Sequence, residues 1–249
     1  MSVPRKTLAS VCLGLRSFLF LGSFFLSTAL FASLGCWILL LPERYVFVYA
    51  RQLSKTIVFF LKYLMGITTC IEGQENIPPG PAIIAMRHES TWETMVLFVY
   101  IERLCFVIKQ ELLYIPFVRS FLMKLGSIAV KRWQKGSSVR ALVAQGRERL
   151  AQGYKILIFP EGTRMAPGVF LPFQRGLGFL YENMKVPVIP AVLNSGRHWP
   201  RRRFYKYPGT ITIRFLPAIP PGMSHERFLE HFTQVFMEAY RDLEEREAA

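Results

Sequence analysis

The sequence feature that most constrains the fold is a run of 25 residues, from Ser17 to Leu41, without a charged side chain. As an α-helix this run is about 37 Å long, enough to cross a hydrocarbon core of about 30 Å. It exceeds the apolar segment of roughly 7–15 residues in a signal peptide, and no small-x-small cleavage site follows it. We therefore expect an N-terminal membrane-associated helix.

A second apolar segment, from Tyr45 to Ile67, also has helical periodicity. It carries Arg51, Lys55 and Lys62 on one helical face, which is typical of a helix that lies in a membrane interface. Two arrangements remain open: the first helix alone spans the membrane, or the two helices form a hairpin embedded from one side. Basic residues flank both ends, so the positive-inside rule does not fix the orientation.

The rest of the chain alternates strand-like and helical segments. A polar linker rich in proline and glycine, from Ile71 to Pro81, separates an N-terminal anchor over residues 1–70 from a globular domain over residues 71–249. Strands are expected at 82–86, 104–108, 127–131, 155–159, 188–193 and 210–216, and helices at 93–101, 116–124, 138–152 and after Ser224. This alternation predicts an α/β fold with a mixed, largely parallel sheet flanked by helices.

The composition favours contact with an anionic surface. The net charge is +14, and 51% of the residues are hydrophobic. The four cysteines are scattered, which fits a reducing compartment facing the cytosol. The sequence contains no P-loop, no complete G-x-G-x-x-G and no metal-ligand cluster, so we expect neither a metal nor a cofactor.

The first candidate catalytic group is the pair His88 and Glu93. A histidine after a buried strand, with a carboxylate on its other ring nitrogen, forms a general base whose tautomer is fixed. Positions i and i+5 are about 140° apart on a regular helix, so the pair meets only if His88 precedes the helix and Glu93 lies in its first turns. A helix N-terminus then disfavours the imidazolium and keeps the histidine neutral.

The second candidate is the stretch Lys155–Arg164, with the sequence KILIFPEGTR. Its apolar residues predict a buried strand that Pro160 ends. Glu161 and Arg164 are thereby presented at the carboxyl end of a strand, where open α/β sheets bind ligands. A guanidinium binds a phosphate through two parallel hydrogen bonds.

These two stretches together carry a family resemblance. The pattern His-x-x-x-x-Glu, followed by FPEGTR from Phe159, 71 residues after His88, resembles the lysophosphatidic acid acyltransferase family (1-acyl-sn-glycerol-3-phosphate acyltransferases). Weaker matching blocks are 109–132 and 186–192. Glu93 stands where the family usually has Asp, and Arg119 stands where the second block often has Gly.

The resemblance implies a membrane-bound acyltransferase without a metal or other cofactor. The acyl donor would be acyl-CoA or acyl-carrier protein, and the acceptor a lysophospholipid at an anionic membrane surface. His88 and Glu93 would be catalytic. The residues expected to bind phosphate and glycerol are Lys109, Glu161, Gly162, Thr163 and Arg164, with Lys131, Arg132 and Arg175 as further candidates. The catalytic domain would cover residues 71–249 and face the cytoplasm.

Three alternatives compete with this interpretation: a different lysolipid acceptor, a hydrolase with Ser90 as nucleophile, and a non-catalytic membrane adaptor. The basic and aromatic segment 197–206 would suit RNA, but an apolar anchor on the same chain favours anionic lipid headgroups instead. We therefore expect no nucleic-acid partner.

Overall fold

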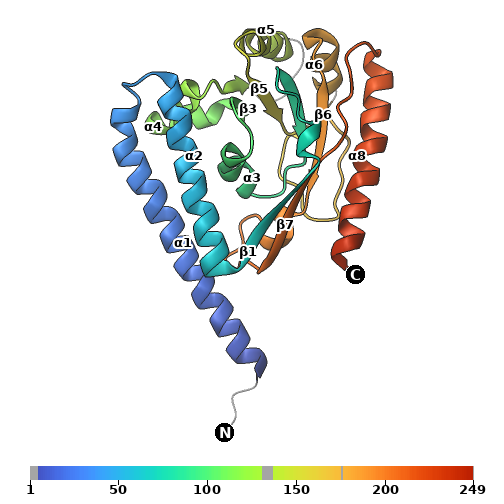
Figure 1. Cartoon of the computed structure of the whole chain (residues 1–249). Helices are drawn as coiled ribbons and strands as arrows, with labels where there is room; N and C mark the ends of the chain where they lie inside the picture. The colour runs from blue at the N-terminus through green and yellow to red at the C-terminus, as the bar shows by residue number, and fades with distance from the viewer. Residues whose placement is uncertain (1–4, 131–136, 175, 249) are drawn as a thin grey trace.

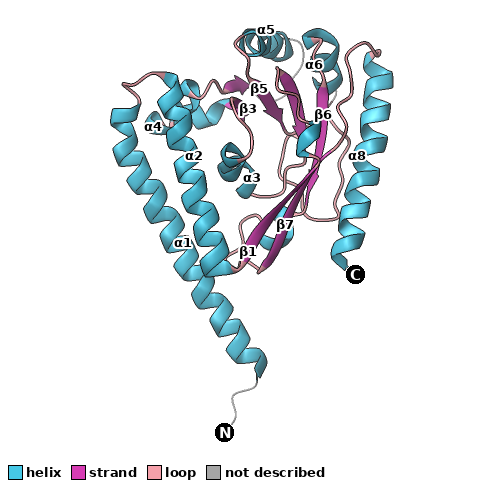
Figure 2. Cartoon of the chain, in the orientation of Figure 1, coloured by secondary structure: helices cyan, strands magenta, loops and turns pink. Residues whose placement is uncertain are grey.

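The computed structural model describes residues 5–130, 137–174 and 176–248. Its centre is a sheet in the order β1-β7-β6-β2-β5-β3-β4, seen edge-on in Figure 2. The strands are β1 (Ile67–Glu72), β2 (Ala82–Met86), β3 (Leu104–Lys109), β4 (Ile128–Val130), β5 (Lys155–Ile158), β6 (Val188–Leu193) and β7 (Gly209–Phe215). Strands β6 and β7 pair antiparallel, whereas the other neighbouring strands are parallel. The predicted α/β fold with a mixed, largely parallel sheet is confirmed.

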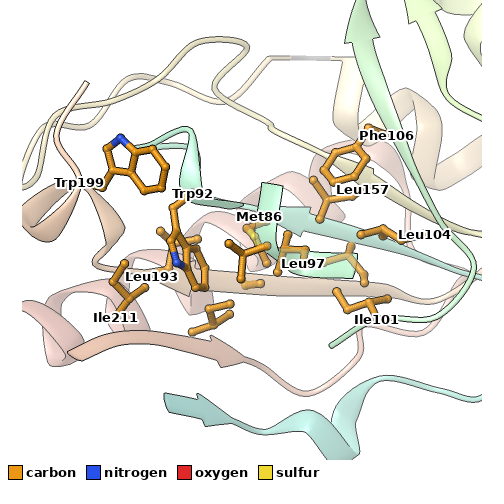
Figure 3. Packing of buried hydrophobic residues seen from close by; sticks show 14 of the residues in the cluster. Met86, Trp92, Leu97, Ile101, Leu104, Phe106, Leu157, Leu193, Trp199 and Ile211 are labelled. Atoms are coloured by element: carbon orange, nitrogen blue, oxygen red, sulfur yellow. The ribbon is translucent and has the colours of Figure 1, made fainter. Parts of the chain in front are cut away.

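Helices cover both faces of this sheet. Every residue of β2 is buried, with Ile84 and Met86 packing into one core layer and Ile83 and Ala85 into the other. This double burial explains why the strand has no polar alternation. The first layer includes α3 (Trp92–Val96), and Figure 3 shows its large side chains, including Trp92, in one cluster. The second layer contains α5 (Ser137–Ala151), α6 (Gly176–Met184) and α8 (His225–Ala248).

The N-terminal helices form an antiparallel hairpin that lies along one side of the body (Figure 1). Helix α1 (Arg5–Ile38) turns before Pro42 into α2 (Glu43–Phe60), which continues as a π-helical turn over Leu61–Met65. The Tyr49 hydroxyl donates to the carbonyl of Phe31 at 2.7 Å and links the two helices. The segment Leu8–Ile38 is long and apolar enough to cross a membrane, and most of it is not buried in the protein. This apolar helix indicates membrane association.

The sequence missed three elements. Strand β1 occupies the end of the expected second helix and the start of the expected linker. It is an edge strand whose residues alternate in exposure, so its sequence lacks the continuous apolar run of the buried strands. Helix α6 and the single turn α7 (Ser195–His198) are the other two. The expected helices at 116–124 and 138–152 correspond to α4 (Pro116–Lys124) and α5, and the expected helix 93–101 ends earlier, followed by a 3-10 turn over Leu97–Val99.

Candidate active site

Three neighbouring strands bring the predicted site segments to one edge of the sheet. Strands β2, β5 and β3 are adjacent and parallel, so their carboxyl ends point the same way. His88 follows β2, the turn Pro160–Arg164 follows β5, and Lys109 is the last residue of β3. Segments far apart in the sequence therefore meet where open α/β sheets bind ligands.

The expected contact between His88 and Glu93 is present. Nδ1 of His88 lies 2.8 Å from Oε1 of Glu93, which sits in the first turn of α3. The ring of His88 stacks on Phe159, with 3.8 Å between the ring centroids and 15° between the planes. The carboxylate is completely buried, while the imidazole keeps 14% of its side chain exposed. Since an ionised carboxylate accepts only, Nδ1 carries the proton and Nε2 is left as the basic nitrogen.

Glu93 is held by more than the histidine. Its Oε1 also accepts hydrogen bonds from the backbone N–H groups of Glu89 and Ser90, both at 2.7 Å. Its Oε2 accepts from the hydroxyl of Ser195, at 2.9 Å, at the start of α7. Four donors thus offset the free-energy cost of burying this carboxylate. Because the carboxylate is held in place, its hydrogen bond to Nδ1 also fixes the orientation of the imidazole. Sequence reasoning missed Ser195, which lies 102 residues from Glu93.

The FPEGTR turn is joined directly to the histidine segment. The backbone N–H of Met165 donates to the carbonyl of His88 at 2.7 Å. Gly162 has a φ of 69°, in the left-handed region that a tight turn requires and glycine tolerates. Arg164 is half-buried; burial lowers the pKa of its guanidinium, and the charge of Glu93 opposes that shift. The guanidinium therefore lies within the electrostatic reach of the catalytic pair.

A buried arginine that sequence reasoning did not select supports this turn from the protein interior. Arg87 is completely buried and donates through Nη2 to the carbonyls of Ala166 and Val169, at 3.2 and 2.8 Å. Its Nη1 lies 3.8 Å from Oε1 of Glu161. Both carboxyl oxygens of Glu161 are buried without a hydrogen-bond partner in the described structure, and burial raises the pKa of this group to about 8. Glu161 therefore faces Arg87 in the protein interior.

Arg87 also belongs to a network that ties the C-terminal helix to the site. Its Nε donates to Oε1 of Glu89 at 2.6 Å, and the same oxygen accepts from the hydroxyl of Tyr240 in α8 at 2.9 Å. The guanidinium stacks over the ring of Tyr240 at 3.8 Å. The N–H of Gly196 donates to Oε2 of Glu89 at 2.9 Å, and a Cβ at position 196 would lie 3.0 Å from that oxygen. The available sequence signal for this network was the pair of opposite charges, Arg87 and Glu89, on either side of His88 directly after the apolar run 82–86.

The remaining candidates differ in their surroundings. Lys109 is exposed at the end of β3, and Thr163 is half-buried in the turn beside Gly162. Lys131, Arg132 and Arg175 lie outside the described residues. Ser90, the nucleophile of the alternative hydrolase, is completely buried, and its hydroxyl accepts a hydrogen bond from the N–H of Trp92 at 3.1 Å. The arrangement therefore offers one basic imidazole nitrogen near the half-buried Arg164, with the exposed Lys109 at the end of β3, two strands from β2.

Comparison with known proteins gives a consistent result. The model of the family described as Acyltransferase matches residues 68–194. The 1-acyl-sn-glycerol-3-phosphate acyltransferase of Pseudomonas aeruginosa is 40% identical over 176 residues, covering 71% of this chain and 68% of that protein. The alpha enzyme of the same name from Homo sapiens is 28% identical over 174 residues, and the match spans 61% of its length.

A solved structure shares the fold. The crystal structure of the 1-acyl-sn-glycerophosphate (LPA) acyltransferase PlsC from Thermotoga maritima superposes with a TM-score of 0.77 and 21% identity, covering 92% of this chain and 97% of that one. At this identity the match shows the architecture, including the N-terminal helices. The family match and the Pseudomonas relative go further: this chain belongs to the acyltransferase family that includes the 1-acyl-sn-glycerol-3-phosphate acyltransferases.

Proposed function

We propose that this chain transfers a fatty acyl group from acyl-CoA or acyl-carrier protein to the sn-2 hydroxyl of 1-acylglycerol 3-phosphate, giving phosphatidic acid. The observation that carries the proposal is the 2.8 Å contact between Nδ1 of His88 and Glu93, formed beside the FPEGTR turn. This contact leaves Nε2 as the nitrogen that accepts a proton. The relatives named for this activity support the choice of substrates.

In the proposed reaction, His88 takes part in two proton transfers. Nε2 of His88 removes the proton from the sn-2 hydroxyl as that oxygen attacks the thioester carbonyl. Glu93 stabilises the imidazolium that forms. Collapse of the tetrahedral intermediate breaks the carbon–sulfur bond, and the imidazolium returns its proton to the departing thiolate. No acyl-enzyme is needed, because the acceptor oxygen is the nucleophile.

The cations of the site bind the acceptor in this proposal. Arg164 and Lys109 hold the phosphate, and the backbone of Gly162 and Thr163 shapes the turn around it. Arg87 supports this arrangement from the interior through its hydrogen bonds to the carbonyls of Ala166 and Val169, and Glu161 lies 3.8 Å from the same guanidinium. Holding the acceptor at both ends converts the attack into a step between positioned groups, which can be worth several powers of ten in rate.

The apolar hairpin supports a reaction at a membrane surface. We propose that the helical part of residues 1–70 acts as the anchor, with α1 and α2 embedded together, and that residues 71–249, with the start of β1 from Ile67, form a catalytic domain that faces the cytoplasm. The large exposed apolar side chains of α1, such as Phe18 and Trp37, support this placement, as does the net charge of +14 beside anionic lipids.

A transfer assay with the purified full chain tests the function. Acyl-CoA and acyl-carrier protein are each combined with lysophosphatidate and with lysolipids that bear other headgroups. We expect transfer to lysophosphatidate at the highest kcat/KM. A higher value for another lysolipid would establish the second candidate, an acyltransferase for a different headgroup. Hydrolysis of the thioester without transfer to any acceptor would contradict both.

A further inference from the structure

A rigid loop over residues 199–207 lies between the N-terminal helix and the FPEGTR turn. The N–H of Tyr207 donates to the carbonyl of His198 at 2.9 Å and closes the base of this loop. Inside it, the buried ammonium of Lys206 donates to the carbonyls of Arg203 and Phe204. Burial lowers the pKa of Lys206 to about 8. The loop therefore has a defined shape, because one hydrogen bond closes its ends and the ammonium of Lys206 binds two of its own carbonyls.

The loop is also fastened to α1. The backbone N–H of Lys206 donates to the hydroxyl of Ser17 at 3.1 Å. The indole of Trp199 packs edge-to-face against Phe20 and Phe24, with ring centroids 5.1 and 5.4 Å apart. Because α1 carries the apolar surface, the position of the loop relative to a membrane is fixed by these contacts.

The same loop extends a cation to the phosphate-binding turn. Nη1 of Arg201 donates to the backbone carbonyl of Arg164 at 3.4 Å, so the guanidinium of Arg201 lies against the turn from which the Arg164 side chain extends. Arg201 and Arg202 are exposed. Burial is the main cause of the lowered pKa of Arg164, and repulsion from these two charges lowers that pKa further. Arg202 adopts a φ of 55°, in the left-handed region, which costs a non-glycine residue free energy. The fold thus concentrates positive charge that repels itself until an anion binds.

We propose that Arg201 is a further phosphate-binding residue, which acts with Arg164 on the phosphomonoester of the acceptor. This inference rests on the proposed function and refines its specificity. A guanidinium has five N–H donors, and the bond to the Arg164 carbonyl uses one of them. A phosphomonoester carries close to two negative charges at neutral pH, whereas a phosphodiester carries one. Two guanidiniums therefore favour lysophosphatidate over lysolipids whose phosphate bears a further headgroup.

Arg203 provides a matched control within the loop. It is exposed like Arg201, and it contributes a backbone carbonyl, not its guanidinium, to the contact with Lys206. If the loop served only to attract an anionic membrane, the two arginines would be interchangeable. If Arg201 binds the acceptor, only its replacement changes the acceptor KM.

The test measures kinetics in uncharged detergent micelles, which remove the anionic lipid surface. We expect Arg201→Ala to raise the KM for lysophosphatidate about tenfold, as loss of a charged hydrogen bond does, with kcat and the donor KM within about twofold. The effect on a phosphodiester lysolipid should be smaller. Arg203→Ala should stay within about twofold of wild type on both acceptors, and Arg201→Lys should fall between them.

Direct binding separates this inference from the proposed reaction. Binding of lysophosphatidate to His88→Ala is compared with binding to the double variant His88→Ala/Arg201→Ala, which requires no turnover. A roughly tenfold weaker Kd in the double variant supports the role of Arg201 even if the reaction were different. Equal Kd values, or equal effects of Arg201→Ala and Arg203→Ala on KM, would overturn it. Failure of wild type to acylate lysophosphatidate would refute the function alone.

Discussion

The two halves of the site are built differently. The catalytic half, His88 and Glu93, is fixed to the protein interior: Glu93 is completely buried and accepts four hydrogen bonds, two of them from backbone. The cationic half, Lys109, Arg164 and Arg201, lies on a strand end and two loops and is partly or fully exposed.

This difference matches the role that we propose for each half. Proton transfer depends on the distance and direction of a hydrogen bond, so a base and its orienting carboxylate benefit from a rigid mount. Phosphate recognition depends on charge, which tolerates small displacements and needs access for the ligand. Changes in the catalytic half should therefore lower kcat, and changes in the cationic half should raise the acceptor KM.

The largest expected effect comes from His88→Ala. Removing the base should lower kcat by about 10³-fold or more, because none of the other described groups that contact Glu93 can replace Nε2 as a base. The variant should remain folded, because three other donors still hold Glu93, although its melting temperature should fall with the loss of the stacking on Phe159. The exposed His231 in α8 gives a matched control, His231→Ala, which should leave kcat unchanged. Transfer by His88→Ala at more than a few per cent of the wild-type rate would remove the histidine from the mechanism.

The next effect tests the cationic half. Arg164→Ala should raise the KM for lysophosphatidate by about 10–100-fold, the value of one or two charged hydrogen bonds, with a smaller change in kcat. Steady-state kinetics with the acceptor varied at saturating donor measure this split. Arg227→Ala, an exposed arginine on α8, serves as the control. A fall in kcat with an unchanged acceptor KM would place Arg164 with the catalytic half and break the comparison.

A smaller effect is expected where the catalytic half is anchored. Ser195→Ala removes the hydrogen bond to Oε2 of Glu93, so kcat should fall about 3- to 10-fold at an unchanged acceptor KM. Ser127→Ala is the control, since Ser127 is a buried serine whose hydroxyl has no partner in the described structure. Identical kinetics for the two variants would show that Ser195 serves packing alone.

The last prediction concerns stability and its dependence on pH. Burial raises the pKa of Glu161 from 4.5 to about 8, so the folded protein retains a proton that the unfolded chain releases. The stability from this proton is fully present below about pH 4.5 and is lost as the pH rises through about 8, at about 1.4 kcal/mol for each pKa unit between the two states. Glu161→Gln stays neutral, so its free energy of unfolding should rise relative to wild type across this window.

Denaturant unfolding from about pH 5 to about pH 8 measures this difference. Parallel curves for the two proteins would mean that Glu161 is ionised in the folded state throughout. The experiment also sharpens the comparison of the two halves, because Glu93 has four donors whereas Glu161 faces Arg87 without a hydrogen bond.

The sequence predicted the parts of the fold and site that local pattern encodes. The buried strands 82–86 and 188–193 were predicted to the residue, because continuous apolar runs between breakers are typical of parallel strands. The spacing of His88 and Glu93 was enough to place them at a helix start. Strand β1 was missed because its stability comes from pairing with β7. The paired residues are far apart in the sequence: Glu72 and Arg214, for example, are separated by 142 residues.

The supporting residues of the site escaped prediction for the same reason. Ser195 and Tyr240 reach their partners only in the folded chain, over 102 and 151 residues, and nothing in their local sequence marks them. Arg201 was visible as part of a basic segment, which the apolar anchor on the same chain assigned to lipid headgroups. Its contact with Arg164 became apparent only from the path of the loop.

The most direct test of the shared site is a structure of the wild-type protein with 1-acylglycerol 3-phosphate and no acyl donor. We predict that the phosphate contacts the guanidinium of Arg164, while the sn-2 oxygen lies about 2.6–3.2 Å from Nε2 of His88. A phosphate bound away from Arg164, or a hydroxyl out of reach of His88 while the phosphate is held there, would contradict the account.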